Sequence, residues 1–159
     1  MIVTVRPYRS GDRAACASVF FHAVRDGASE FYNEDQRRAW APSELPTPGT
    51  ADSLLDQWCW VAQAGGRIVG FFSMEPEGYL DMAFVLPEVK GQGVADLLYD
   101  ALIARAQTEG LTTLTVKASH LAGRFFAKHG WQIDHAEDFA SNGQIFERFH
   151  MSRTLKELA

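Results

Sequence analysis

The stretch "EVKGQGVADLLYDAL", residues 88–102, places two glycines one residue apart directly before a segment with helical periodicity. The apolar residues of that segment recur at the spacing of one helix face, and they are Val94, Leu97, Leu98, Ala101 and Leu102. The pattern predicts a buried helix that ends near Gly110. The first N–H groups of a helix have no intrahelical partner and carry the positive end of its dipole, and glycine lets a ligand come close. The stretch therefore predicts a diphosphate site at a strand-to-helix junction.

Three kinds of phosphate-binding loop use glycines in this way, and the neighbouring residues separate them. A loop for nucleoside triphosphates has Gly-Lys-Ser/Thr at the helix start, where this chain has Gly-Val-Ala. A dinucleotide loop needs another glycine at the position of Asp96, and it opens the first strand-helix unit of a parallel sheet. The third kind of loop binds coenzyme A. A turn without a ligand explains Gly91 and Gly93 equally well when the pair is taken alone.

The chain before this loop alternates between strand and helix patterns. "IVTVRPY" has the alternation of a strand, and a helix with an apolar side follows it. Asn33 with Gln36 forms a capping-box pattern for a second, short helix that ends before Pro42. A long proline-containing connection, residues 42–57, comes next. Three strand-like runs, "WCWVAQA", "RIVGFFSME" and "YLDMAFVL", then predict an antiparallel meander.

The chain after the loop repeats the strand-helix order and closes on a hairpin. "LTTLTVKA" is rich in β-branched residues, and Ser119 is placed to cap a helix that ends at Gly130. Two further strand-like segments are joined by Asn142 and Gly143, a strong hairpin signal. The whole order predicts an α/β (α+β) fold, with a mixed, mostly antiparallel seven-stranded sheet and helices on both of its faces.

Length, charge and cysteine content narrow the kind of protein. The chain has 159 residues, which suits a single domain over residues 1–159. The net charge is −5 and the basic residues are scattered, so we expect neither a nucleic acid nor a membrane surface as a partner. Cys16 and Cys59 have no metal-ligand spacing, so we expect reduced thiols, no bound metal and a cytoplasmic location. No apolar run reaches the length of a membrane span.

The stretch from Phe84 to Leu102, together with the order of elements, resembles the GNAT superfamily of acyl-CoA-dependent N-acetyltransferases. The loop "KGQGVA" is similar to the family's Q/R-x-x-G-x-G/A motif, with Lys90 at a position that is arginine or glutamine in many members. A second segment, "SHLAGRFFAKHGW", is similar to the family's N-x-x-A-x-x-F-Y-x-K-x-G-F. It departs from that pattern at Ser119, which replaces the asparagine, and at Phe126, which replaces the tyrosine.

The resemblance implies acetyl-CoA as a co-substrate and no metal. Loop amides would hold the diphosphate, and the pantetheine arm would pair like an extra strand with the fourth strand. The amide of Phe84 or Val85 would then hold the oxyanion of the thioester. Asp96 lies close to this diphosphate, and we expect its charge to face solvent. The residues implied in acetyl-CoA binding are Ala83, Phe84, Val85, Lys90, Gly91, Gln92, Gly93, Val94, Ala95, Ser119 and Phe126.

Transfer to an amine requires a base, because an ammonium must lose a proton before it attacks. The candidate catalytic residues are Asp81, Tyr79 and His22. Asp81 and Tyr79 share a strand face by two-residue alternation, although a partly exposed strand aspartate explains Asp81 equally well. His22 lies off the apolar side of the first helix, where it would reach the acceptor side with Glu30. A structural surface histidine is the alternative.

In many members of this family a tyrosine at the position of Phe126 protonates the departing CoA thiolate, which phenylalanine cannot do. A thiol with a pKa of about 8.5 is still a tolerable leaving group near neutral pH, so we expect water or another residue to supply the proton. The hypothesis is an N-acetyltransferase that acetylates a primary amine of a small molecule in a ternary complex. Phe31, Tyr32 and Trp40 lie where family members shape the acceptor pocket, although core packing also explains them.

Two other functions stay open at this point. One alternative is a non-catalytic module that binds or senses acyl-CoA, because the family tyrosine is missing. The chain is also compatible with an N-acetyltransferase for proteins or peptides, and a homodimer is compatible with each reading.

Overall fold

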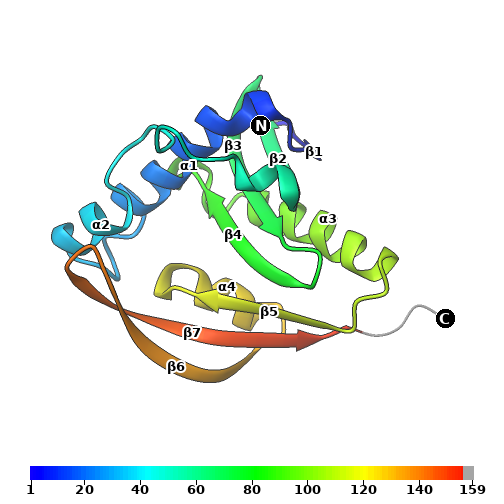
Figure 1. Ribbon diagram of the computed structural model, residues 1–159. Coiled ribbons are helices and arrows are strands. Elements are labelled where there is room, and N and C mark those ends of the chain that lie inside the picture. The colour runs from blue at the N-terminus through cyan, green and yellow to red at the C-terminus, as the bar shows by residue number, and fades with distance from the viewer. Residues whose placement is uncertain (156–159) are drawn as a thin grey trace.

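A computed structural model describes residues 1–155, which form one seven-stranded sheet with four α-helices (Figure 1). The strands are β1 Val3–Pro7, β2 Trp58–Ala64, β3 Arg67–Met74, β4 Tyr79–Val85, β5 Thr113–Ala118, β6 Gln132–Ser141 and β7 Gln144–Thr154. The α-helices are α1 Arg13–Arg25, α2 Glu34–Trp40, α3 Val94–Thr108 and α4 His120–Lys128. In space the strands follow the order β1-β2-β3-β4-β5-β7-β6. Only β4 and β5 pair in parallel within these residues, so the predicted mixed, mostly antiparallel sheet is confirmed.

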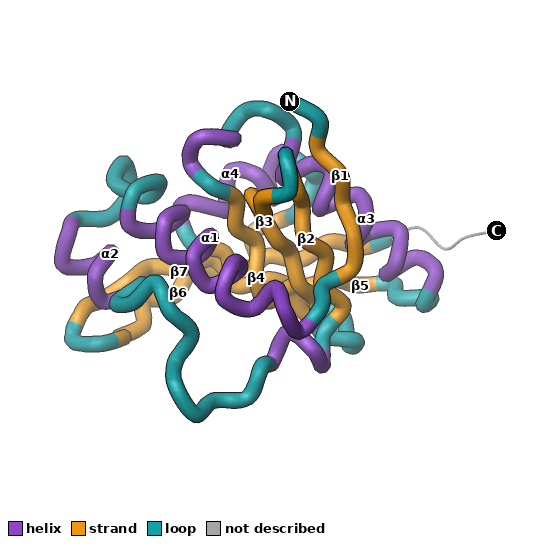
Figure 2. Tube along the Cα trace, turned by 90° about the horizontal axis from the view of Figure 1, so that it is seen from above, coloured by secondary structure: helices purple, strands orange, loops and turns teal. Residues whose placement is uncertain are grey.

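Helices cover both faces of the sheet, as predicted. Figure 2 shows the central strands between α1 on one side and α3 on the other. Helix α1 packs on β3 and β4, and α3 packs across β1 to β4. Among the described residues, no helix combines the length and the apolar character that a membrane crossing requires.

The buried face of α3 differs from the predicted one: Val94, Leu98 and Leu102 are buried as expected, Ala101 is only partly buried, and Leu97 is exposed. Leu97 is 45% exposed, and Tyr99 is buried in its place. The helix packs closely on β3 at Gly70, where an added Cβ would lie 3.1 Å from Cδ1 of Leu98. This close approach fixes the rotation of the helix about its axis. The Tyr99 hydroxyl is then turned inward, where it accepts a hydrogen bond of 2.9 Å from Nε1 of Trp131.

Strands β4 and β5 separate soon after they begin to pair. Their register contains only the pairs Tyr79↔Thr115 and Leu80↔Val116. Beyond this point β4 stays on β3 as far as Val85, and β5 stays on β7. Figure 1 shows the two strands diverging from their shared starting edge. The edge of β4 from residue 81 to residue 85 is therefore left without a strand partner among residues 1–155.

Helix α2 is fixed against the β6–β7 hairpin, far away in the sequence. The predicted capping box forms, since Asn33 accepts from the Gln36 amide and Gln36 accepts from the Asn33 amide. The Gln36 side chain also donates to the Ile145 carbonyl at 3.0 Å, and Asn142 of the hairpin turn donates to the Ala39 carbonyl at 2.8 Å. These contacts place α2 beside the open end of the gap between β4 and β5.

Asp12 is a nearly buried acid that ties the start of α1 to β1. Its two carboxylate oxygens accept hydrogen bonds of 2.8 Å from the Arg6 guanidinium, and Oδ2 also accepts from the Arg9 amide. The Arg6 hydrogen bonds hold the pKa of Asp12 below its ordinary value, against the opposite effect of burial. The carboxylate therefore stabilises the fold above its unfolded-state pKa, and this contribution is lost as the pH falls through the folded-state pKa.

We expect Asp12→Ala to lower the free energy of unfolding at pH 7 by about 2 kcal/mol, less than a fully buried ion pair loses. The smaller cost follows because Arg6 keeps 19% of its side chain exposed. Urea denaturation measures the difference, with Asp100→Ala on the exposed side of α3 as the control. The difference should shrink in strongly acidic solution, and an equal loss at both pH values would contradict a role for the charge.

Candidate functional site

Two cavities meet where β4 and β5 separate. One, of about 280 Å³, lies beside the glycine loop, and we call it the loop cavity. The other, of about 300 Å³, is lined mainly by aromatic rings, and we call it the aromatic cavity. Both are lined by Ala83, Phe84, Leu121, Ala122 and Phe126. The cavities are therefore two parts of one cleft that passes along the open edge of β4.

The loop cavity is built from the strand-to-helix junction. Gly91 and Gly93 both have a φ of 81°, which a residue with a Cβ rarely adopts, and a Cβ on either would meet no protein atom within 4 Å. Within residues 1–155, the N–H groups of Gly91, Gly93, Val94 and Ala95 have no protein acceptor. The open space beside these donors leaves room for an anionic ligand.

Most of the predicted loop residues line the cavity. They are Lys90, Gly91, Gly93, Val94 and Ala95. Gln92 lies outside this lining, and its side chain donates to the Glu88 carbonyl at 3.1 Å. Asp96 was expected to face solvent, and its side chain is 47% exposed. It also lines the loop cavity, and its Oδ1 lies 2.8 Å from Nε2 of His129 at the end of α4.

Along β4, the direction of each amide follows from one hydrogen bond. The Leu86 amide donates to the Val69 carbonyl at 2.8 Å, so every second amide before it also points toward β3. Phe84 is one of these, which corrects the expectation that its amide is open to the cleft. The amides of Ala83 and Val85 point away from β3, into the gap. The Phe84 side chain instead packs edge-on against Phe20 of α1, with ring centroids 4.9 Å apart.

The aromatic cavity lies between α1, α2, α4 and the β6–β7 hairpin. Its aromatic lining consists of Phe20, Tyr32, Trp40, Phe84, Phe126, Phe139 and Phe146. Asp81 of β4 lies at its edge, and the side chain accepts a hydrogen bond of 2.9 Å from Nε2 of Gln57. Glu147 and Arg148 of β7 line the opposite side. The cavity therefore offers an apolar interior with carboxylates at its margin.

Comparison with known protein families shows to which family this chain and its cleft belong. The acetyltransferase (GNAT) domain profile matches residues 31–154, which includes the loop, the separated strands and α4. The chain belongs to the GNAT superfamily. A curated relative of this GNAT protein, the uncharacterized N-acetyltransferase YafP of Escherichia coli K12, is 34% identical over 149 residues. That alignment covers 94% of each chain.

Solved structures share the GNAT fold over the full length of the chain. A GCN5-related N-acetyltransferase from Rhodopseudomonas palustris is 32% identical, has a TM-score of 0.87, and covers 98% of this chain and 99% of its own. The PaiA N-acetyltransferase of Thermoplasma acidophilum, solved with coenzyme A, has a TM-score of 0.73 at 16% identity, with 98% and 100% covered. YncA of Salmonella typhimurium, a putative acetyltransferase solved with acetyl-CoA, has a TM-score of 0.68 at 20% identity, with 100% and 97% covered.

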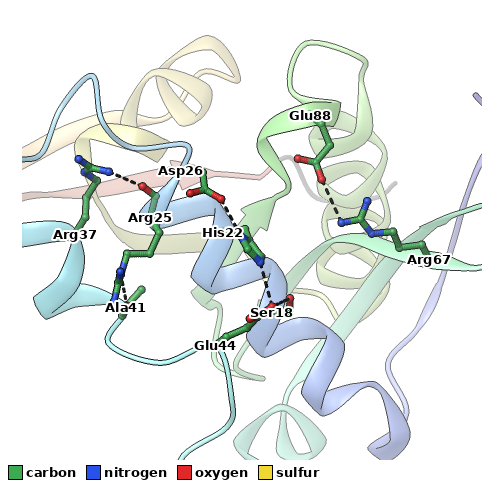
Figure 3. A network of polar contacts seen from close by, with 9 residues as sticks. All are labelled: Ser18, His22, Arg25, Asp26, Arg37, Ala41, Glu44, Arg67 and Glu88. Carbon is green, nitrogen blue, oxygen red and sulfur yellow. Dashed lines mark hydrogen bonds and ion pairs between the residues drawn. The ribbon is translucent and has the colours of Figure 1, made fainter. Parts of the chain in front are cut away.

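Two of the three predicted catalytic residues of this GNAT protein line neither cavity. His22 lies on α1 with its ring between Asp26, at 2.8 Å, and Glu44, at 3.1 Å, as Figure 3 shows. The Asp26 hydrogen bond raises the pKa of His22, which fits the structural alternative. The register of β4 on β3 shifts by one residue between Tyr79 and Met82. The two-residue alternation that was expected to put Tyr79 and Asp81 on the same face of the sheet is therefore interrupted. Of the three, only Asp81 faces the cleft.

The two departures from the family motif both lie in the cleft. Ser119 lines the aromatic cavity and caps α4, where its hydroxyl accepts from the Ala122 amide at 3.3 Å. Phe126 is fully buried, lines both cavities and packs on Trp131 with ring centroids 5.0 Å apart. Among residues 1–155 no group of three or more His, Cys, Asp or Glu is arranged to hold a metal ion.

Sequence reasoning missed the part of the cleft that the β6–β7 hairpin contributes. Phe139, Phe146 and Glu147 line the aromatic cavity because the hairpin folds back beside α2. Their sequence pattern resembles that of any exposed hairpin. The Asn-Gly turn predicted the hairpin itself, but no local sequence signal indicated that the hairpin would line the aromatic cavity.

Proposed function

We propose that this GNAT protein transfers the acetyl group of acetyl-CoA to a primary amine of a small molecule by direct attack in a ternary complex. One observation carries the proposal: the unpaired edge of β4 runs between the glycine loop and the aromatic cavity. Such a cleft accommodates a long thioester along the edge and an acceptor at its end.

In this proposal, loop donors bind the diphosphate and β4 binds the rest of acetyl-CoA. The N–H groups of Gly91, Gly93, Val94 and Ala95 have no protein acceptor within residues 1–155 and lie at the open helix start, and Lys90 adds a positive charge. Val85 lines only the loop cavity, so its amide pairs with the pantetheine arm. Ala83 lines both cavities, so its amide meets the thioester carbonyl and holds the oxyanion. Two structures of the same fold were solved with coenzyme A or acetyl-CoA, which supports acetyl-CoA as the ligand of this cleft.

The acceptor occupies the aromatic cavity with its amine toward Asp81. Seven aromatic rings favour an acceptor with a flat apolar body over one with many hydroxyl groups. Asp81 attracts the ammonium and removes its proton, so that the neutral amine attacks the thioester. The cavity volume of about 300 Å³ suits a small molecule better than a protein surface.

Thiol release tests the proposal. Purified protein is incubated with acetyl-CoA and arylalkylamines, aliphatic amines, polyamines, aminoglycosides or peptides, and free CoA is followed with a thiol reagent. Cys16 and Cys59 are buried, so they contribute little to the signal. Turnover on a small amine supports the proposal. Saturable thermal stabilisation by CoA without turnover identifies a non-catalytic module, and turnover on peptides alone identifies a peptide acetyltransferase.

We expect Asp81→Asn to lower kcat/KM at pH 7 by at least about tenfold, less than the effect of a buried general base because water reaches this exposed carboxylate. Asparagine keeps an oxygen for the Gln57 hydrogen bond, so the fold is retained. The loss should shrink as the pH approaches the pKa of the acceptor amine, because a neutral amine needs no base. Asp100→Asn serves as the control. A loss that stays constant with pH would contradict the role of Asp81.

A further inference from the structure

The cleft contains a phenol that the family motif does not provide. Tyr32 lies between α1 and α2, lines the aromatic cavity and is only 5% exposed. Its ring packs on Trp40 and Phe146, with centroids 5.4 and 5.9 Å away. These contacts hold the ring in one position, in the same cavity as Phe126.

The hydroxyl of Tyr32 is placed at the start of α4. Its oxygen accepts a hydrogen bond of 2.9 Å from the His120 amide, at the positive end of the helix dipole. The Ser119 side chain also acts on it, and it lowers the pKa of Tyr32. Within residues 1–155, the Tyr32 O–H donates to no protein group. Since the His120 amide occupies the oxygen from the protein side and no protein acceptor takes the hydroxyl proton, that proton is available to the cavity that Tyr32 lines.

Burial keeps the Tyr32 hydroxyl protonated near neutral pH, while the hydrogen bond from the His120 amide would stabilise the phenolate that forms when the proton is given up. Burial raises the pKa of Tyr32 above its ordinary value, and the His120 and Ser119 hydrogen bonds partly oppose that shift. The charged and titratable groups around it are Glu147 of β7, which also raises the pKa, and the His120 ring, which lies 3.0 Å from Glu147. Arg37 of α2 faces the Tyr32 carbonyl, not its hydroxyl. Tyr32 is therefore neutral near pH 7, and the His120 amide is placed to stabilise a phenolate.

Other side chains of the aromatic cavity are poorer proton donors. Lys117 of β5 also lines the cavity, but it is an exposed residue, whereas the Tyr32 hydroxyl is buried. The Arg148 guanidinium is bound to Glu137 and lies over the Phe139 ring, and arginine does not give up a proton.

We propose that Tyr32 donates the proton that the CoA thiolate takes up as it leaves, a role that rests on the acetyl transfer proposed above. The amine nitrogen bonds to the thioester carbon, the C–S bond breaks with its electron pair on sulfur, and the Tyr32 O–H proton passes to that sulfur. The ammonium loses two protons: Asp81 takes the first before the attack and passes it to water, and the second goes from the acylated nitrogen to water. The Tyr32 phenolate regains its proton from water. The products are the N-acetylated amine, free CoA thiol and one proton released to solvent.

Tyr32→Phe tests this role, because it removes the hydroxyl and keeps the ring. We expect kcat to fall about tenfold at pH 7 and the deficit to disappear above about pH 9, where a thiol of ordinary pKa leaves as the thiolate. The Kd of acetyl-CoA should not change. Tyr8→Phe, which removes the hydroxyl that binds Asp52 and lies outside both cavities, is the matched control.

The double variant Tyr32→Phe with Phe126→Tyr supplies a second readout. It places a phenol at the family position in the same cavity, so it should restore part of the rate at pH 7. An undiminished rate for Tyr32→Phe, a deficit equal at pH 7 and pH 9.5, or a double variant as slow as the single one overturns the assignment. Wild-type protein that binds CoA but releases no thiol overturns the proposed function as well, whereas an active wild type with a fully active Tyr32→Phe overturns this role alone.

Discussion

Ala83→Pro is expected to reduce kcat by roughly 10²–10³, the loss seen when one oxyanion donor is removed from an active site. The Ala83 amide points into the gap between β4 and β5, away from β3. Proline removes this N–H without breaking a hydrogen bond between β4 and β3. Steady-state kinetics with acetyl-CoA and the best amine of the panel measures the effect.

Two comparisons distinguish a loss of oxyanion stabilisation from a loss of folding in Ala83→Pro. Ala83→Gly keeps the N–H, so it should retain most of the rate despite a modest loss of strand stability. Circular dichroism and the thermal midpoint should show that Ala83→Pro is still folded. A folded Ala83→Pro variant with a near-normal kcat would show that the oxyanion is stabilised elsewhere.

Gly93→Val is expected to weaken CoA binding by about a hundredfold or more, because two hydrogen bonds to a charged diphosphate are worth about 3 kcal/mol together. The glycine caps α3 with a φ of 81°, and the space beside it is open. A valine side chain would fill the space that the diphosphate needs to reach the loop amides. Isothermal titration with CoA measures the loss.

Gly110→Val is the matched control for backbone strain. Gly110 has a φ of 75°, also lies in open space, and follows the opposite end of α3. Both substitutions should therefore destabilise the fold by similar amounts, whereas only Gly93→Val should affect the Kd of CoA. Equal effects of the two variants on the Kd would place the diphosphate away from the loop.

The fold was predictable because its signals are local and agree with one another. The Asn33 capping box, the Ser119 cap and the Asn142-Gly143 turn each fix a boundary through neighbouring residues, and each boundary lies where the sequence indicates. Leu97 was assigned to the wrong side of α3, because the buried side depends on how closely the helix approaches Gly70. Local periodicity carries no information about such a contact.

The site was predictable only where one segment builds it. The loop from Lys90 to Ala95 needs its own glycines and its own helix, so its residues could be named from the sequence. The choice among Asp81, Tyr79 and His22 needed the register of β4 on β3 and the partners of the His22 ring. These depend on residues far away in the sequence.

The sequence by itself determined the order of elements, the glycine loop, the family and the absence of the family tyrosine at Phe126. Only the tertiary structure decided that the amides of Ala83 and Val85, and not that of Phe84, point into the cleft. The direction of each amide depends on which strand it pairs with. The tertiary structure also decided that Tyr32 lies in the same cavity as Phe126, since that proximity requires α2, α4 and the β6–β7 hairpin to pack together.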